Sequence, residues 1–430
     1  MSWFFFLAGA SLPIGYWFQG IQLSVLQPLQ NSVLERILVA DADVPPPSSE
    51  APLPPQVVPH KPIPVAGPTG QVTLPERLLA LQSKRESMDR PLRIVQIGDS
   101  HTAGDFFTEQ LRRRLQARFG DGGIGWIIPG PVNGQSAARY DVSLSGAWTF
   151  QTGRSFTAKD LPFGGFMNTG SAGSRLMIRR TLPTSPGTGR FGALVRRTPG
   201  SLPASLQLIG AGRTSQIFQL TPQWMPVELL MNHNSSSQYV MQVVSGKVDV
   251  AGLWLEYERP GVVLDHIGRN GATLLDIQRW SDTAMTSLFR ARPVDAILLA
   301  YGTNESVDNF DTSTYSARIN TVLRRLQLAA PGTPVIVITA PSFSQGGGSD
   351  CSQYRPRSLL AVVRAQLAAA KFPGVQVWNW MQAMGGECSV AQWSRQGLMA
   401  ADWIHMTPAG YRRSADLFHG WLQAQINQPQ

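Results

Sequence analysis

Short apolar strands alternate with amphipathic helices along two separated stretches of the chain, and this pattern limits the fold more than any other feature. Mostly apolar runs lie at residues 94–97, 294–299, 335–338 and 375–378. Apolar side chains at helical spacing follow at residues 107–119, 315–329, 359–370 and 408–422. Strands that alternate with helices predict a parallel sheet with helices on both faces. The expected fold class is α/β.

Capping residues mark the two ends of this pattern. Thr73 and Glu76 have the spacing of a capping box, and leucines follow at helical spacing. Thr407 stands directly before Pro408, an arrangement typical of a helix that begins with proline. We therefore expect the α/β pattern to begin near residue 73 and to end with a helix from residue 408.

Between residues 136 and 258 the chain changes character. Segments at 205–209, 215–220 and 239–244 alternate polar and apolar side chains or are β-branched, with Gly, Pro, Asn and Ser between them. This predicts an antiparallel β-sandwich inserted into the α/β domain. Long loops are the alternative, but unstructured excursions of this length are uncommon in compact domains. The α/β domain is then discontinuous, spanning residues 73–135 and 259–430.

The first residues are apolar and aromatic, and no charged side chain occurs before Glu35. Residues 1–25 indicate a membrane anchor or an export signal. A buried or interfacial helix is the alternative, because Pro13 and Gly15 interrupt the segment and a basic start is missing. Residues 26–72 are rich in proline, which favours extended chain and suits a linker or a disordered tail.

Composition excludes several classes of protein. The chain has 37 Lys and Arg against 28 Asp and Glu, a net charge of +9, and the basic residues are mostly scattered arginines. A nucleic-acid binder would concentrate them on one face, so we expect no nucleic-acid partner. Two cysteines exclude a cysteine-rich zinc module.

Ser100 lies in the motif Gly-Asp-Ser-His, where the first strand ends and its helix begins. Catalytic groups of open parallel sheets collect at the carboxyl ends of strands. The backbone N–H of Ser100, near a helix start, can face a developing oxyanion. An ordinary helix cap would look the same. His101 beside it can contact a substrate or make a structural hydrogen bond.

Asp402 and His405 lie three residues apart in the loop before the final helix. A serine hydroxyl becomes a good nucleophile when an imidazole takes its proton, and that imidazole needs an orienting carboxylate. Asp402 and His405 can supply both, although a surface ion pair has the same spacing. Gly271 and Asn304 follow in turn-rich segments and could donate to an oxyanion; as plain turns they need no such role.

The four motifs, GDSH, NGA, GTNE and DxxH in this order, resemble the SGNH (GDSL-type) hydrolase superfamily. The resemblance implies a flavodoxin-like, three-layer α/β/α domain without a cofactor. It further implies a triad of Ser100, His405 and Asp402, with Ser100 as nucleophile. The oxyanion hole is then formed by the backbone N–H of Ser100 with Gly271 and Asn304.

A closer resemblance adds a substrate. The run GDSHTAGDFF, the glycine-rich segment at 119–126 and the inserted β domain are similar to peptidoglycan O-acetylesterases of Gram-negative cell envelopes. This implies removal of acetyl groups from muramic acid, a carbohydrate-binding insert, and a periplasmic location with the N-terminus anchoring the chain to the inner membrane. An O-acetyltransferase using the same residues, or an inactive glycan-binding envelope protein, remain the alternatives.

The two cysteines, Cys351 and Cys388, each follow a strand end. A disulfide between them would suit an oxidising periplasm, and two free thiols are the alternative. Asp105, Glu109 and Glu305 lack metal-ligand spacing with any histidine, so no metal is expected. Four tryptophans could stack on sugars or fill the core: Trp126, Trp148, Trp254 and Trp403.

Overall fold

A computed structural model describes residues 72–83, 90–153, 161–182, 186–233, 238–307, 312–345 and 351–427. The apolar N-terminal segment, 1–25, lies outside the described residues, as does the proline-rich segment up to residue 71. The expectations for both segments stay predictions. Among the helices that are described, none combines the length and the apolar character needed to cross a membrane.

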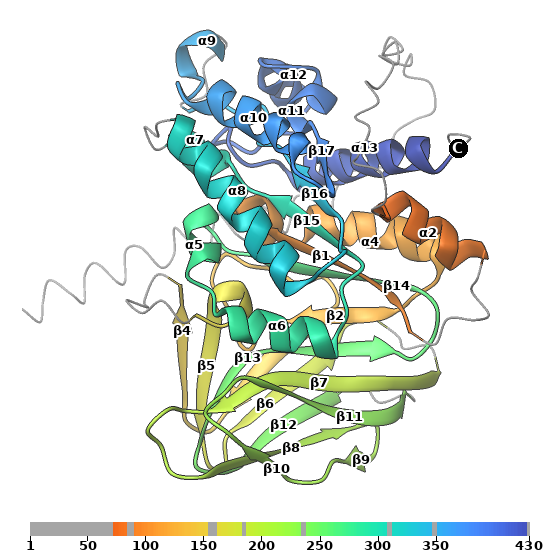
Figure 1. The fold of residues 1–430 in the computed structure, drawn as a ribbon, viewed down its shortest axis with the longest axis vertical. Helices are drawn as coiled ribbons and strands as arrows, with labels where there is room; N and C mark the ends of the chain where they lie inside the picture. The colour runs from red at the N-terminus through yellow and green to blue at the C-terminus, as the bar shows by residue number, and fades with distance from the viewer. Residues whose placement is uncertain are drawn as a thin grey trace, which may run out of the picture. The chain divides into compact units, whose positions relative to one another are not determined.

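Five parallel strands form the central sheet of the α/β domain (Figure 1). They are β1 (Leu92–Gly98), β14 (Val262–Gly268), β15 (Ala296–Ala300), β16 (Val335–Ile338) and β17 (Val375–Trp378). Their order in the sheet is β14-β1-β15-β16-β17. Counted along the chain this is 2-1-3-4-5, the flavodoxin-like order. The predicted α/β class is confirmed.

Helices cover both faces of this sheet, because alternate side chains of each strand point to opposite sides. On one face Ile94 packs with α2 (Leu74–Ser83), α4 (Phe106–Phe119), α11 (Trp380–Met384), α12 (Ser389–Arg395) and α13 (Pro408–Ile426). On the other face Val95 packs with α5 (Leu274–Gln278), α6 (Asp282–Ala291), α8 (Thr312–Ala329) and α10 (Leu359–Ala368). Short elements complete the domain: α3 (Ser100–Ala103), α7 (Thr303–Val307), α9 (Cys351–Tyr354) and η3 (Ala369–Lys371).

Two antiparallel sheets form the inserted part. One runs β10 (Phe218–Leu220), β8 (Ala204–Gly210), β12 (Gln238–Ser245), β6 (Arg175–Arg180) and β3 (Tyr140–Ser145), with β9 (Arg213–Thr214) paired to β8. The other runs β11 (Met225–His233), β7 (Gly187–Arg197), β13 (Lys247–Tyr257), β5 (Phe166–Ser171) and β4 (Trp148–Thr152), and η2 (Phe163–Gly165) precedes β5. Leu206, Tyr239 and Val250 meet in one buried core, which confirms the predicted insert.

Strand β2 (Gly123–Ile127) pairs with β13 and so belongs to the second antiparallel sheet, although the sequence placed it in the α/β domain. The glycines explain its position. A Cβ on Gly123 would lie 2.6 Å from the Glu256 Cα, and one on Gly125 would lie 2.2 Å from Asp265 Oδ1. Only a strand without side chains at these points can pass so close to both parts of the chain.

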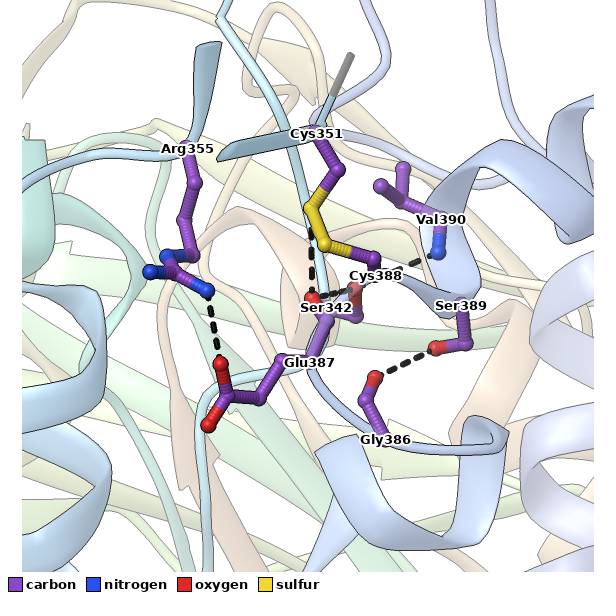
Figure 2. The surroundings of a disulfide bond; sticks show 8 residues. All are labelled: Ser342, Cys351, Arg355, Gly386, Glu387, Cys388, Ser389 and Val390. Atoms are coloured by element: carbon purple, nitrogen blue, oxygen red, sulfur yellow. Dashed lines mark hydrogen bonds and ion pairs between the residues drawn. A yellow bond between two sulfur atoms is a disulfide. The ribbon is translucent and has the colours of Figure 1, made fainter. Parts of the chain in front are cut away.

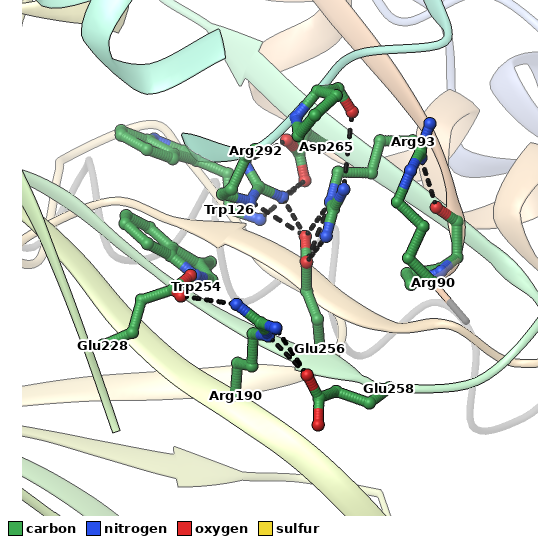
Figure 3. Close-up of polar contacts among 12 residues, drawn as sticks. Arg90, Arg93, Trp126, Arg190, Glu228, Trp254, Glu256, Glu258, Asp265 and Arg292 are labelled. Carbon is green, nitrogen blue, oxygen red and sulfur yellow. Dashed lines mark hydrogen bonds and ion pairs between the residues drawn. The ribbon is translucent and has the colours of Figure 1, made fainter. Parts of the chain in front are cut away.

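A buried ionic network joins the insert to the α/β domain (Figure 3). Glu256 of β13 accepts hydrogen bonds from Arg93 of β1 (2.8 Å, Nε to Oε2) and from Arg292 after α6 (2.9 Å, Nε to Oε1). Arg292 also donates to Asp265 of β14 at 2.9 Å. All four side chains are at least nine-tenths buried. Burial alone would raise the pKa of Glu256, but Arg292 and Arg93 lower that pKa to about 2.

The structure joins Cys351 and Cys388 by a disulfide at the edge of the α/β domain (Figure 2). The backbone oxygen of Glu387, next to Cys388, accepts a hydrogen bond from the Ser342 hydroxyl at 2.7 Å. The Glu387 carboxylate pairs with Arg355 at 2.8 Å. The disulfide therefore closes a junction between the segments that follow β16 and β17.

Replacing both cysteines by serine is expected to lower the free energy of unfolding. The bridge closes a sequence separation of 37 residues. On the loop-entropy model this corresponds to about 3–4 kcal/mol. Chemical unfolding of the double variant beside the wild type measures the loss. Equal unfolding curves would contradict the expectation, and so would two reactive thiols in the unreduced wild type.

Candidate active site

Ser100 is the first residue of α3, directly beyond the carboxyl end of β1. Asp99 caps this helix, and its Oδ1 accepts a hydrogen bond from the His101 N–H at 3.0 Å. Gly98 makes the close turn possible, because a Cβ there would lie 2.7 Å from the Ala300 oxygen of the neighbouring strand. Ser100 is half-buried at the sheet edge, where a nucleophile of this fold class is expected.

His405 connects Ser100 to Asp402. Its Nε2 lies 2.8 Å from Ser100 Oγ, and its Nδ1 lies 2.6 Å from Asp402 Oδ2. The other Asp402 oxygen accepts the backbone N–H of His405 at 2.9 Å. Trp403, at φ 57°, turns the chain between them in the left-handed region. The structure thus brings a hydroxyl, an imidazole and a carboxylate into one hydrogen-bonded series, the geometry that the predicted nucleophile, base and orienting group require.

The pKa values of this pair shift in opposite directions. The hydrogen bond that His405 donates to Asp402 raises the pKa of His405, because the carboxylate stabilises the charged imidazole. Partial burial would raise the pKa of Asp402, but hydrogen bonds from the His405 side chain and backbone lower that pKa. Asp402 is therefore ionised wherever His405 titrates, and it holds Nδ1 in the protonated form that leaves Nε2 free to accept.

If His405 is the base of a serine esterase, as the sequence predicts, the rate of ester cleavage is expected to rise with pH, since His405 must be neutral to accept the proton of Ser100. The inflection of kcat/KM on a small aryl acetate should lie above the ordinary histidine value of 6.5. Asp402→Asn should move it to lower pH and lower the rate by about 10²–10⁴-fold. Asp416→Asn, which removes a surface partner of Arg114, is the matched control. An inflection that stays in place in Asp402→Asn would contradict this assignment.

Asn304 lies in the short helix α7, which is hydrogen-bonded to the turn that contains Gly271. The Asn304 amide donates to the Ala272 oxygen at 2.9 Å, which leaves its second hydrogen for a ligand. Gly271 adopts φ 70° in the adjoining turn. The backbone N–H of Arg269 donates to the Gly98 oxygen at 3.2 Å and ties this loop to the strand before Ser100. The predicted oxyanion residues are therefore at the same sheet edge as Ser100.

Glu305 connects two segments at this edge, a role that was not predicted from the sequence. Its Oε1 accepts the Leu274 N–H at 2.8 Å, and its Oε2 accepts the Gly302 N–H at 3.1 Å. The side chain is fully buried, and burial raises its pKa to about 7. One carboxylate therefore holds the start of α5, just after the Gly271 turn, against the start of α7, which carries Asn304. The spacing from Gly302 to Glu305, as in a capping box, was the available signal.

His101 is almost fully buried and has a structural partner, which favours the second of its two predicted roles, while a substrate contact stays a prediction. Its ring is 4% exposed, and Nδ1 lies 2.9 Å from the Tyr411 hydroxyl. The ring also packs edge-on against Trp380. Burial lowers the pKa of His101 to about 3, so it stays neutral. A structural hydrogen bond, the alternative named above, describes this residue.

The other candidate residues have structural partners. Asp105 and Glu109 both pair with Arg112. Within the part of the chain that the structure describes, no three His, Cys, Asp or Glu side chains are grouped to hold a metal ion. Trp126 and Trp254 stack on each other in the core at 6.2 Å between ring centroids. Trp148 and Trp403 are partly buried.

Known proteins share both parts of this chain. A GDSL-like lipase/acylhydrolase family model matches residues 249–413, and a model of the N-terminal part of peptidoglycan O-acetylesterase matches residues 122–228. The structure of a peptidoglycan O-acetylesterase is 30% identical, with a TM-score of 0.71; the alignment covers 81% of this chain and 95% of that one. A search of curated proteins gave no match.

Two further solved structures are much less similar to this chain. A Bacillus subtilis protein is 12% identical, with a TM-score of 0.35 and coverage of 67% and 90%. A family two carbohydrate esterase from Cellvibrio japonicus is 13% identical, with a TM-score of 0.27 and coverage of 67% and 99%.

The fold and the first family match define an acyl hydrolase of the GDSL or SGNH type, a carboxylic ester hydrolase. Ser100 lies before the matched range because the insert separates its motif from the rest of the domain. Within this class, the chain belongs to the peptidoglycan O-acetylesterase family.

Proposed function

We propose that this protein removes O-acetyl groups from muramic acid residues of peptidoglycan. The observation that supports this most is the hydrogen-bonded series Ser100, His405 and Asp402 at the sheet edge. It occurs in a chain 30% identical to a solved peptidoglycan O-acetylesterase. The fold and family define an ester hydrolase, and the similarity to this relative is the reason for proposing peptidoglycan as the substrate.

The reaction proceeds in two halves. Ser100 Oγ attacks the acetyl carbonyl carbon while His405 Nε2 takes the hydroxyl proton. The oxyanion accepts hydrogen bonds from the backbone N–H groups of Ser100 and Gly271 and from the Asn304 amide. The tetrahedral intermediate then expels the sugar oxygen, which receives the proton from His405. Water attacks the acetyl-enzyme with His405 as base, and acetate leaves as Ser100 regains its proton.

Water access favours hydrolysis over transfer of the acetyl group to another sugar. The side chains of His405 and Asp402 are 39% and 46% exposed, so water reaches the base directly.

Because peptidoglycan is the proposed substrate, we also propose that the protein lies in the periplasm, with residues 1–25 as its anchor to the inner membrane. The disulfide suits that oxidising compartment.

Acetate release from O-acetylated peptidoglycan by the full chain tests this function. Peptidoglycan freed of its esters by mild base is the blank, and a small aryl acetate is the parallel substrate. Acetate release from O-acetylated peptidoglycan, with none from the blank, supports the proposal. Cleavage of the aryl acetate without release from peptidoglycan would keep the esterase and overturn its substrate. Acetyl transfer to an added glycan in excess of acetate release would replace hydrolysis by transfer.

A further inference from the structure

A groove of about 350 Å³ lies where the insert meets the α/β domain. Four separate segments line it: the loop at 131–135, strand β4, strand β5, and the loop of Arg269 and Asn270. In Figure 1, β4 and β5 lie beneath α5, which follows that second loop. The Arg279 guanidinium donates to the Gly153 oxygen at 2.9 Å and holds α5 against the end of β4.

Hydrogen bonds tie the loops of the groove to segments that adjoin the predicted catalytic residues. Gln135 donates to the Gly268 oxygen at 2.6 Å, and Asn270, which precedes Gly271, donates to the Gly134 oxygen at 3.0 Å. The Ser136 N–H donates to the Ala103 oxygen at 3.3 Å. Ala103 ends the single helical turn that begins with Ser100. One end of the groove therefore lies about one helical turn from the nucleophile.

The lining of the groove combines aromatic rings with amide side chains. Phe150 of β4 is half-buried and stacks on the buried Phe166 of β5, with ring centroids 6.2 Å apart. The lining also includes the amide side chains of Asn133, Gln135 and Asn270, of which Gln135 and Asn270 also donate to backbone oxygens. An aromatic ring packs on the C–H face of a pyranose, and amides bond hydroxyl and N-acetyl groups. The volume is that of a small-molecule site.

The charge of the residues that line the groove indicates which part of peptidoglycan it can bind, the sugar or the peptide stem. Its residues are Pro131, Val132, Asn133, Gln135, Phe150, Thr152, Phe166, Arg269 and Asn270, with no carboxylate among them. The Arg269 guanidinium pairs with Asp276, so its charge is balanced. A nearly neutral groove with an aromatic wall suits an uncharged sugar better than the charged groups of a peptide stem.

We propose that this groove binds an N-acetylhexosamine ring of the glycan strand, next to the muramic acid whose ester reaches Ser100. The inference rests on the proposed function and adds a specificity site to it. Phe150 supplies the stacking surface, and Asn133 supplies a polar contact at the exposed rim. Neither residue belongs to the catalytic machinery, so both can be changed without touching the reaction at Ser100.

The test compares two substrates in matched variants. Phe150→Ala and Asn133→Ala should lower kcat/KM on O-acetylated peptidoglycan, about tenfold for Phe150→Ala, and leave kcat/KM on a small aryl acetate unchanged. Phe218→Ala, on the edge strand β10 of the other sheet, is the control for loss of an aromatic side chain from the insert. It should change neither rate.

A binding measurement separates this inference from the proposed function. A soluble tetrasaccharide of alternating N-acetylglucosamine and N-acetylmuramic acid is titrated into Ser100→Ala with and without Phe150→Ala. Weaker binding in the double variant supports the groove. Equal tetrasaccharide binding by the two proteins, together with an unchanged ratio of kcat/KM on the two substrates, would overturn the role of the groove. Acetate release by the wild type would still support the proposed function. Equal losses on both substrates would also overturn the role of the groove, and a wild type inactive on peptidoglycan would overturn the function itself.

Discussion

Ser100→Ala is expected to abolish acetate release, with kcat falling by about 10⁵–10⁶-fold. Without the Oγ atom no acetyl-enzyme can form, and His405 loses the hydroxyl that lies 2.8 Å from its Nε2. Only the oxyanion donors and substrate binding remain to assist direct attack by water. A coupled acetate assay on O-acetylated peptidoglycan and on a small aryl acetate measures the loss.

The matched control for this variant is Ser143→Ala, an exposed serine on β3 of the insert. It should keep the full rate. The unfolding midpoint of Ser100→Ala should stay near that of the wild type, since Ser100 is half-buried and a single hydroxyl is removed. A Ser100→Ala protein that keeps even a tenth of the wild-type rate would exclude Ser100 as the nucleophile.

Glu256→Ala is expected to cost about 3–5 kcal/mol of the free energy of unfolding, because it leaves Arg93 and Arg292 buried without their shared partner. Glu258→Ala is the control two residues along the chain (Figure 3). Its side chain is 26% exposed and pairs with the half-exposed Arg190, so its loss should cost at most about 1 kcal/mol. Urea unfolding of both variants measures the difference, and equal losses would contradict the role given to the network.

The contribution of Glu256 should depend on pH with a defined sign. Its pKa is about 2 in the folded protein and near 4.5 in the unfolded chain. A lowered folded-state pKa gives stability that is complete above about 4.5 and is lost as the pH falls towards about 2. The gap in stability between the wild type and Glu256→Gln should close over that window. A gap that stays constant across it would show that charge is not the stabilising factor.

Local patterns were enough to predict much of the α/β domain. The apolar runs of β15, β16 and β17 contain few or no polar residues, so periodicity locates them. Strand β14 was not predicted, because Asp265 and His266 interrupt its apolar run. Burial of Asp265 is compensated by Arg292 after α6 and by the Trp126 N–H of β2, and periodicity shows neither partner. Strand β2 was placed in the wrong domain for a similar reason, since its partner β13 lies more than 100 residues further along the chain.

The sequence by itself determined the local parts of the site: the turn at Ser100 and the pair of Asp402 and His405, whose hydrogen bond spans three residues. Tertiary structure alone decided which distant groups meet. Ser100 and His405 are 305 residues apart and come within 2.8 Å only because β1 and the last loop end at one sheet edge. The Glu305 bridge, the Glu256 network and the groove beside Phe150 likewise join segments distant in sequence. Such contacts depend on strand order and on side chains packing across elements, which a linear pattern does not encode.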